Sequence, residues 1–209
     1  MYEKFGQFID GSWSPSTDKG TYEVINPATE EVLGHASKAT SADVDKALKS
    51  AEKGLQVWKK TTPWNRSYIL RRIADKLREK KDVLAKWMTL ENGKPLAEGV
   101  GETNGAADIF EWNAEETKRI FGQTIESRFE DTRVHVYYQP VGVVAALSPW
   151  NFPLILAARK ISTALAAGCS VIIKPDTITP GVVMELVDIC RECGVPPGAV
   201  NLLSGDPPS

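Results

Sequence analysis

The residues best suited to chemistry lie in loops that follow apolar segments. Asn151 stands between Pro149 and Pro153, and two prolines stiffen a loop on either side of the amide. A rigid side-chain amide can donate a hydrogen bond to a developing oxyanion. The alternative is a turn-forming Asn that bonds to its own backbone, and the local pattern by itself favours this alternative.

Lys174 is the second candidate, because it ends an apolar segment and Thr177 follows three residues later. A cation and a hydroxyl at the carboxyl edge of a sheet can bind ribose hydroxyls or a phosphate. A solvated lysine is the simpler alternative. The dinucleotide fingerprint GxGxxG is absent from the run Ser148 to Pro153. We therefore expect the phosphates of any dinucleotide to be held mostly elsewhere.

The cysteines and histidines are weaker candidates for catalysis or metal binding. Cys190 and Cys193 have redox spacing, but they fall in the last turn of a predicted helix, where the dipole destabilises a thiolate. With Cys169 they are predicted to be packing residues, so none is a candidate nucleophile. His35 and His135 have no Cys or acid at ligand spacing, so no metal site is predicted.

An alternation of strands and helices positions these loops. From Val141 onward the pattern predicts strand, helix, strand, helix, strand over 141–147, 154–167, 170–173, 180–193 and 200–203. Such alternation builds a parallel sheet of the nucleotide-binding kind, and its first strand, continuously apolar, is predicted to be buried on both faces. Ligands should gather at the carboxyl ends, in the loops 148–153, 174–179 and 204–209.

The preceding part of the chain is mostly helical. Thr40 and Asp43 predict a capping box before a helix whose inward stripe is Val44, Leu48, Ala51, Leu55 and Trp58. Further helical patterns follow near 65–77, 83–88 and 93–122. Two short strands are predicted at 8–13 and 21–27, and alternation over 133–138 predicts a half-exposed strand, with one face wet or covered by a partner subunit.

Composition excludes several classes of function. The 209 residues carry 25 Lys and Arg against 27 Asp and Glu, a net charge of −2, so no positive field favours nucleic acid or an anionic membrane. No apolar stretch approaches the ~20 residues needed to cross a bilayer, and residues 1–10 lack a signal-peptide core. Three cysteines, an odd number, fit a reducing compartment. We expect a soluble cytoplasmic protein.

Several linked motifs carry a resemblance over essentially the whole chain. The segments 148–153 (SPWNFP), 164–169 (ALAAGC) and 173–175 (IKP) resemble the aldehyde dehydrogenase superfamily, most closely its succinate-semialdehyde and related NAD(P)-dependent semialdehyde members. The resemblance continues through 23–29 (EVINPAT), 91–98 (ENGKPLAE), 111–116 (EWNAEE), 194–198 (GVPPG) and 201–205 (NLLSG).

The resemblance implies an α/β fold: the amino-terminal portion of the aldehyde dehydrogenase fold, with an incomplete Rossmann-like parallel sheet and an oligomerisation hairpin. Residues 1–121 would form the amino-terminal part of the cofactor-binding domain and 122–140 the hairpin. Residues 141–209 would form the first strands and helices of the Rossmann-like region. The hairpin implies a homodimer or homotetramer.

The implied reaction is NAD(P)-dependent oxidation of a small aldehyde, such as succinate semialdehyde, to the carboxylic acid. In the family a cysteine thiolate attacks the aldehyde, hydride passes to nicotinamide, and a glutamate-activated water hydrolyses the thioester. Asn151 occupies the position of the family's oxyanion-binding asparagine, which overturns the local preference for a turn residue. The implied cofactor-binding residues are Leu147, Ser148, Pro149, Trp150, Lys174, Asp176, Thr177 and Gly205.

Two departures limit this assignment. Many NAD-preferring members have a glutamate at the position of Thr177, and a neutral hydroxyl leaves both NAD and NADP admissible. The sequence also ends at Ser209, before the family's catalytic cysteine, its catalytic glutamate and the rest of the catalytic domain. We therefore expect part of a longer enzyme, or a chain completed by a partner polypeptide. The alternative is a truncated, non-catalytic nucleotide-binding or assembly module.

Overall fold

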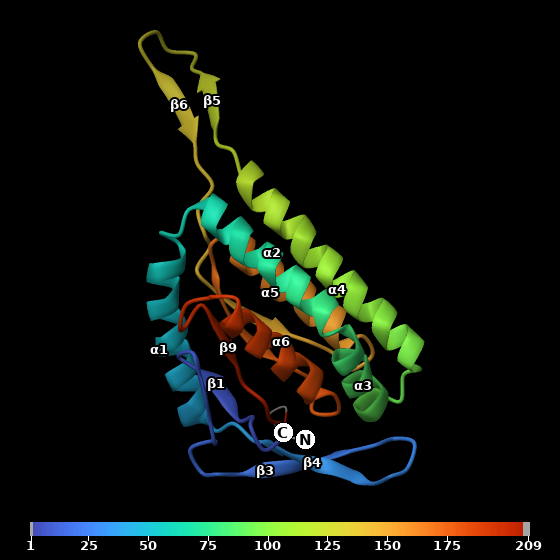
Figure 1. Cartoon of the computed structure of the whole chain (residues 1–209). Helices are drawn as coiled ribbons and strands as arrows, with labels where there is room; N and C mark the ends of the chain where they lie inside the picture. The colour runs from blue at the N-terminus through green and yellow to red at the C-terminus, as the bar shows by residue number, and fades with distance from the viewer. Residues whose placement is uncertain (1, 207–209) are drawn as a thin grey trace.

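One mixed sheet between helices organises the chain (Figure 1). The computed structural model describes residues 2–206. Its strands are β1 (Gln7–Ile9), β2 (Ser12–Ser14), β3 (Thr21–Ile25), β4 (Val32–Ser37), β5 (Gln123–Glu126), β6 (Arg133–Val136), β7 (Val143–Leu147), β8 (Ser170–Lys174) and β9 (Val200–Leu202). Its helices are α1 (Ser41–Trp58), α2 (Pro63–Glu79), α3 (Lys81–Asn92), α4 (Leu96–Glu116), the short η1 (Thr117–Arg119), α5 (Pro153–Ala166) and α6 (Pro180–Glu192).

The central sheet has the strand order β2-β1-β9-β8-β7. Strands β7, β8 and β9 are parallel, as the alternation predicts, and β5 and β6 form a separate hairpin. The amino-terminal hairpin β1–β2 extends the sheet, because β1 pairs antiparallel with β9 through Phe8 and Leu202. The first and last parts of the described chain therefore share one sheet.

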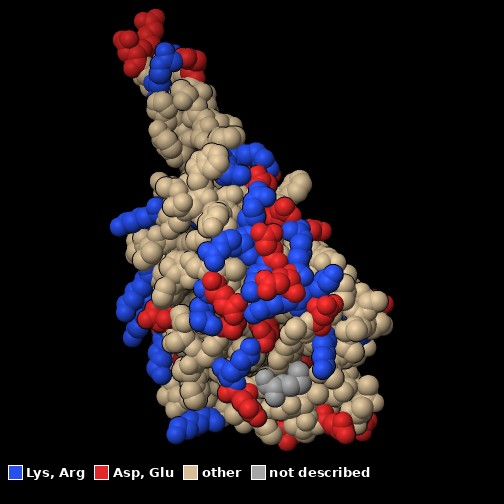
Figure 2. All heavy atoms as spheres, in the orientation of Figure 1, with Lys and Arg blue, Asp and Glu red and all other residues tan. Residues whose placement is uncertain are grey.

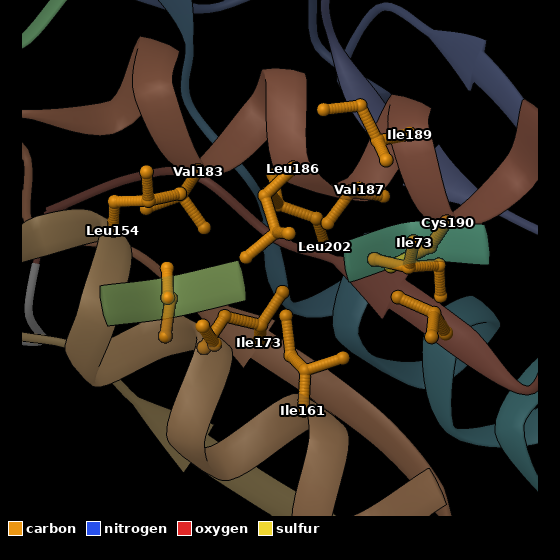
Figure 3. Packing of buried hydrophobic residues seen from close by; sticks show 14 of the residues in the cluster. Ile73, Leu154, Ile161, Ile173, Val183, Leu186, Val187, Ile189, Cys190 and Leu202 are labelled. Carbon is orange, nitrogen blue, oxygen red and sulfur yellow. The ribbon is translucent and has the colours of Figure 1, made fainter. Parts of the chain in front are cut away.

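One layer of helix covers one face of the sheet, and two layers of helices cover the other. Helix α1 packs on one face, and α5 and α6 pack on the other. Helices α2, α3 and α4 form a further layer outside α5 and α6. Figure 3 shows the resulting core, in which Ile173 and Leu202 of the sheet meet Ile161 of α5 and Leu186 of α6. This core fixes the two helices that follow β7 and β8.

The prediction that 141–147 is buried on both faces is wrong. Strand β7 is an edge strand with β8 as its partner, and Leu147 remains 65% exposed while Ala146 is buried. A groove of about 490 Å³ runs between β7 and α5, lined mainly by apolar atoms of residues such as Val144, Ala145 and Ala164. A continuous apolar run indicates that both faces of a strand can be buried. Within residues 2–206 the faces of β7 are buried only in part.

The amino-terminal strands also differ from the prediction. The segment 8–13 contains a tight turn at Asp10 and Gly11, both with positive φ, so it contributes to two strands rather than one. The strand at 21–25 pairs instead with β4, which the sequence pattern did not predict. His35 within β4 interrupts its apolar pattern.

The capping box at the start of α1 is confirmed. The Thr40 side chain accepts from the Asp43 backbone N–H, and the Asp43 carboxylate accepts from the Thr40 backbone N–H. The predicted stripe is correct for Ala51 and Trp58, which are buried, but Val44 and Leu48 remain about 40% exposed. The buried face is shifted because α1 crosses closely over a turn at Gly198, where a Cβ on Gly54 would lie 2.1 Å from the Gly198 carbonyl carbon.

The β5–β6 hairpin projects from the body of the molecule (Figure 1). Its stem is largely uncharged and its tip carries charges (Figure 2). Ile125, Val134 and Tyr137 are exposed, so both faces of the ribbon are open in the single chain. Across residues 2–206, none of the helices combines the length and the hydropathy required to traverse a bilayer.

Candidate functional site

The carboxyl edge of the parallel strands contains an open cleft of about 620 Å³. It lies between the loop that follows β7 and the loop that follows β8. Its lining residues are Leu147, Ser148, Pro149, Lys174, Pro175, Asp176 and Thr177. All of them except Pro175 are among the residues that the sequence predicted for cofactor binding.

Gly205 lies in a neighbouring cleft of about 300 Å³ on the α1 side of the sheet. Leu147 and Lys174 line both clefts, and the exposed Val44 and Leu48 of α1 form part of the second wall. The structure therefore brings seven of the eight predicted cofactor residues to one sheet edge, divided between two adjoining clefts, and Trp150 lines neither of them. The last three residues of the predicted loop 204–209 lie outside the described residues.

The loop that carries Asn151 is exposed at its tip and fixed at its ends. Trp150, Asn151 and Phe152 are exposed, and none of them lines the 620 Å³ cleft. The backbone N–H of Ser148 donates to the Lys174 carbonyl oxygen over 3.0 Å. The Ser148 hydroxyl donates across the loop to the Pro153 carbonyl oxygen over 3.2 Å.

A turn between α3 and α4 holds the tip of this loop by its carbonyl groups. The Asn92 side-chain amide donates to the Trp150 carbonyl oxygen over 3.0 Å. The Lys94 ammonium donates to the Asn151 carbonyl oxygen over 3.1 Å and lies 4.1 Å from the centre of the Phe152 ring. The hydrogen bond from Lys94 thus holds Asn151 by its backbone carbonyl, and the residue as a whole is exposed.

Buried carboxylates occupy the amino termini of both helices that leave this edge. Glu102 of α4 accepts from the backbone N–H groups of Leu154 and Ile155 at 2.9 and 3.1 Å, at the start of α5. Glu91 of α3 accepts from those of Gly181 and Val182 at 2.7 and 3.2 Å, at the start of α6. Because these N–H groups already donate to carboxyl oxygens, neither helix terminus is free to bind a phosphate.

Glu91 lies in an unusual environment. Its carboxyl group is fully buried and accepts from the Tyr2 hydroxyl, and the Tyr2 ring packs edge-on against the Trp87 ring. Burial raises the pKa of Glu91 to about 7, against the hydrogen bonds that favour its ionised form. A Cβ at Gly181 would lie 2.6 Å from the Glu91 Oε1 and 2.2 Å from the Trp87 ring, so the contact requires glycine there.

Comparison with known proteins places this geometry in a family. A protein-family model described as "Aldehyde dehydrogenase family" matches residues 13–209. The chain belongs to the aldehyde dehydrogenase family. The resemblance inferred from the sequence motifs is confirmed, and so is the α/β fold of the amino-terminal portion.

Curated aldehyde dehydrogenases resemble the chain over almost its full length. Glutarate-semialdehyde dehydrogenase of Pseudomonas putida is 43% identical over 198 residues, which is 95% of this chain and 41% of that protein. The NADP(+) succinate-semialdehyde dehydrogenase of Escherichia coli K12 is 41% identical over 197 residues, 94% of this chain and 41% of that protein. The chain thus spans about two fifths of the length of these relatives.

A solved aldehyde dehydrogenase structure agrees closely with this fold. The crystal structure of betaine aldehyde dehydrogenase from Staphylococcus aureus in complex with NAD+ superposes with a TM-score of 0.93 at 36% identity. The alignment covers 96% of this chain and 40% of that one.

The three cysteines of this chain lie away from the cleft edge. Cys169 precedes β8, at the opposite end of that strand from Lys174, and Cys190 and Cys193 lie at the end of α6. All three are buried, and burial raises the pKa of the Cys190 and Cys193 thiols. Within residues 2–206 no cluster of His, Cys, Asp or Glu has the geometry of a metal site.

The residues that hold the Asn151 loop and the start of α6 were missed by the sequence reasoning. Glu91 and Lys94 were noted only as parts of the motif 91–98, and Glu102 was not noted. Their contacts join positions 52 to 90 residues apart, and local sequence patterns do not reveal such contacts. One signal was available. Both helices begin with proline, at Pro153 and Pro180, and neither has a side-chain N-cap, so their free N–H groups require acceptors from elsewhere.

Proposed function

We propose that the chain is the cofactor-facing part of an NAD(P)-dependent aldehyde dehydrogenase that oxidises a small semialdehyde, such as succinate semialdehyde, to the carboxylic acid. Family membership and the names of the relatives support the reaction and the substrate class. The observation that carries the proposal is the cleft of about 620 Å³ at the carboxyl edge, which gathers six of the eight residues assigned to the cofactor.

The lining of the cleft fits a dinucleotide. Lys174 and Thr177 supply a cation and a hydroxyl for the adenosine ribose, while Trp150, which lies outside the lining, is assigned to the cofactor by the family resemblance alone. Thr177 carries no charge that would repel a 2′-phosphate, so both NAD and NADP fit the proposal. A nicotinamide cofactor, when bound, supplies the hydride acceptor.

Asn151 is assigned to the oxyanion. Its exposed carboxamide donates a hydrogen bond to the aldehyde oxygen as negative charge develops there, and the fixed loop limits the reorganisation that this requires. Removal of such a donor typically lowers kcat by ~10²–10³-fold.

The hairpin β5–β6 is assigned to subunit assembly. Its uncharged, exposed stem supports pairing with a second subunit in a homodimer or homotetramer. A cytoplasmic location remains a prediction from the free thiols.

A second candidate is a non-catalytic nucleotide-binding or assembly module. The burial of all three cysteines favours it, because residues 2–206 then contain no thiol accessible to an aldehyde. Under the first proposal the nucleophile comes from polypeptide outside these residues.

An activity assay separates the two candidates. We would measure aldehyde-dependent formation of NADH or NADPH with succinate semialdehyde, and the intact mass of the same sample. Oxidation by a sample that contains a longer polypeptide supports the dehydrogenase. No oxidation by any form, together with cofactor binding tighter than aldehyde binding, supports the module. Oxidation by a verified chain of 209 residues contradicts the assignment of the nucleophile to polypeptide outside this chain.

A further inference from the structure

The Lys94–Glu102 ion pair is buried directly beneath the Asn151 loop. The side chains are 6% and 1% exposed, and the Lys94 ammonium donates to one carboxylate oxygen of Glu102. Lys94 comes from the turn before α4, and Glu102 from the second turn of that helix. Because both charges are removed from water, each requires complete pairing.

The Lys94 ammonium is completely paired. An ammonium has three N–H donors, and here it has three partners: Glu102, the Asn151 carbonyl oxygen at 3.1 Å, and the Phe152 ring at 4.1 Å. Two of these partners are consecutive residues of the same loop. The ammonium therefore contacts the backbone carbonyl of Asn151 and the side-chain ring of the residue that follows it.

Glu102 fixes the other end of the same loop. While one of its oxygens faces Lys94, the other accepts from the N–H groups of Leu154 and Ile155. The position of the first turn of α5 is thereby tied to the position of the ammonium. Asn151 is held from both sides, and the dihedral angles of its side chain remain its principal freedom.

We propose that Lys94 and Glu102 are positioning residues for Asn151, which set the direction in which its carboxamide can donate a hydrogen bond. A buried ion pair contributes little net stability compared with apolar packing, so its main consequence here is the geometry of the loop. This inference rests on the proposed oxyanion role of Asn151. The held backbone itself can be tested separately from that role.

The first test observes the Asn151 carbonyl directly. The chain contains one Asn–Phe dipeptide, Asn151–Phe152, so labelling with ¹³C′-Asn and ¹⁵N-Phe gives one cross-peak that reports this carbonyl by NMR. We expect Lys94→Met to move or broaden this peak, and Lys94→Arg to retain it near the wild-type position. The matched control is Lys80→Met, which removes a partly buried lysine that pairs with Glu192 at the end of α6.

The second test measures kinetics in the aldehyde-oxidising enzyme that contains this chain. We expect Lys94→Met to lower kcat about tenfold to a hundredfold, because the Asn151 carboxamide would no longer be aligned with the aldehyde oxygen. The KM for cofactor should be unchanged. In an Asn151→Ala background the same substitution should lower kcat less than twofold. Glu102→Gln, which keeps an acceptor but loses the charge, should follow the same pattern.

The outcomes are distinguishable. An unshifted Asn151–Phe152 peak in Lys94→Met overturns the inference, as does a kcat loss of equal size with and without Asn151. If the wild-type enzyme oxidises no aldehyde, the proposed function fails, and the NMR comparison still decides whether Lys94 holds the loop. If Lys94→Met does not fold, the comparison of Glu102→Gln with Lys94→Arg decides in its place.

Discussion

Glu91→Gln should remove a pH dependence of stability from the protein. The buried carboxyl of Glu91 has a pKa of about 7 in the folded chain, compared with 4.5 for an ordinary glutamate. Between these two values the folded protein keeps the proton and the unfolded chain loses it. The contribution of Glu91 to stability is therefore complete below pH 4.5 and is lost as pH rises to about 7.

The magnitude follows from the width of this window. Each pH unit changes the free energy of unfolding by about 1.4 kcal/mol for one proton, so the total change is on the order of 3 kcal/mol. Glutamine does not titrate, and this slope should be absent from the variant. The variant should also be less stable below pH 5, because one amide oxygen cannot replace the acceptors for two backbone N–H groups and the Tyr2 hydroxyl.

Urea unfolding at low micromolar protein, followed by tryptophan fluorescence at pH 5, 6, 7 and 8, measures the effect. The control is Glu79→Gln, whose exposed carboxylate pairs with Lys76 at the surface. The stability difference between wild type and Glu91→Gln should shrink as pH rises, while that for Glu79→Gln stays constant. A difference that is independent of pH, or that grows with pH, would refute a protonated Glu91.

Three further changes test other parts of the structure. Thr177→Glu should weaken NADP binding at least about tenfold through repulsion of the 2′-phosphate, with NAD binding retained; calorimetric titration of both cofactors checks this, and equal losses contradict it. Val136→Asp should disperse the proposed oligomer, and an unchanged mass by light scattering counts against assembly through the hairpin. Thr40→Ala should destabilise the chain by about 1 kcal/mol through loss of the α1 cap; an unchanged urea midpoint would show that the box contributes nothing.

The parts of the fold that follow local rules were predictable from sequence. Thr40 and Asp43 lie three residues apart, and their reciprocal hydrogen bonds need no distant partner. Gly168 adopts the left-handed conformation directly after α5, which is the common place for a glycine that ends a helix and is also a local feature. The carboxyl-edge location of the cleft followed from the alternation of strands and helices alone.

Features that depend on distant contacts were not predictable in this way. The exposure of Leu147 depends on which strands pair beside β7, and the exposure of Val44 depends on the angle at which α1 crosses the sheet. The turn that holds Asn151 through Lys94 lies 57 residues away in sequence. Patterns in a single sequence do not reveal which distant residues are in contact. Only the family resemblance identified Asn151 as a functional residue.

The central claim is that the Asn151 carboxamide stabilises an oxyanion. The most direct measurement compares kcat and cofactor affinity of wild type and Asn151→Ala in the aldehyde-oxidising enzyme that contains this chain. We expect kcat to fall by ~10²–10³-fold while the Kd for cofactor stays within about twofold of wild type. A kcat that is unchanged, or a parallel loss of kcat and cofactor affinity, would contradict the claim and assign Asn151 a structural role.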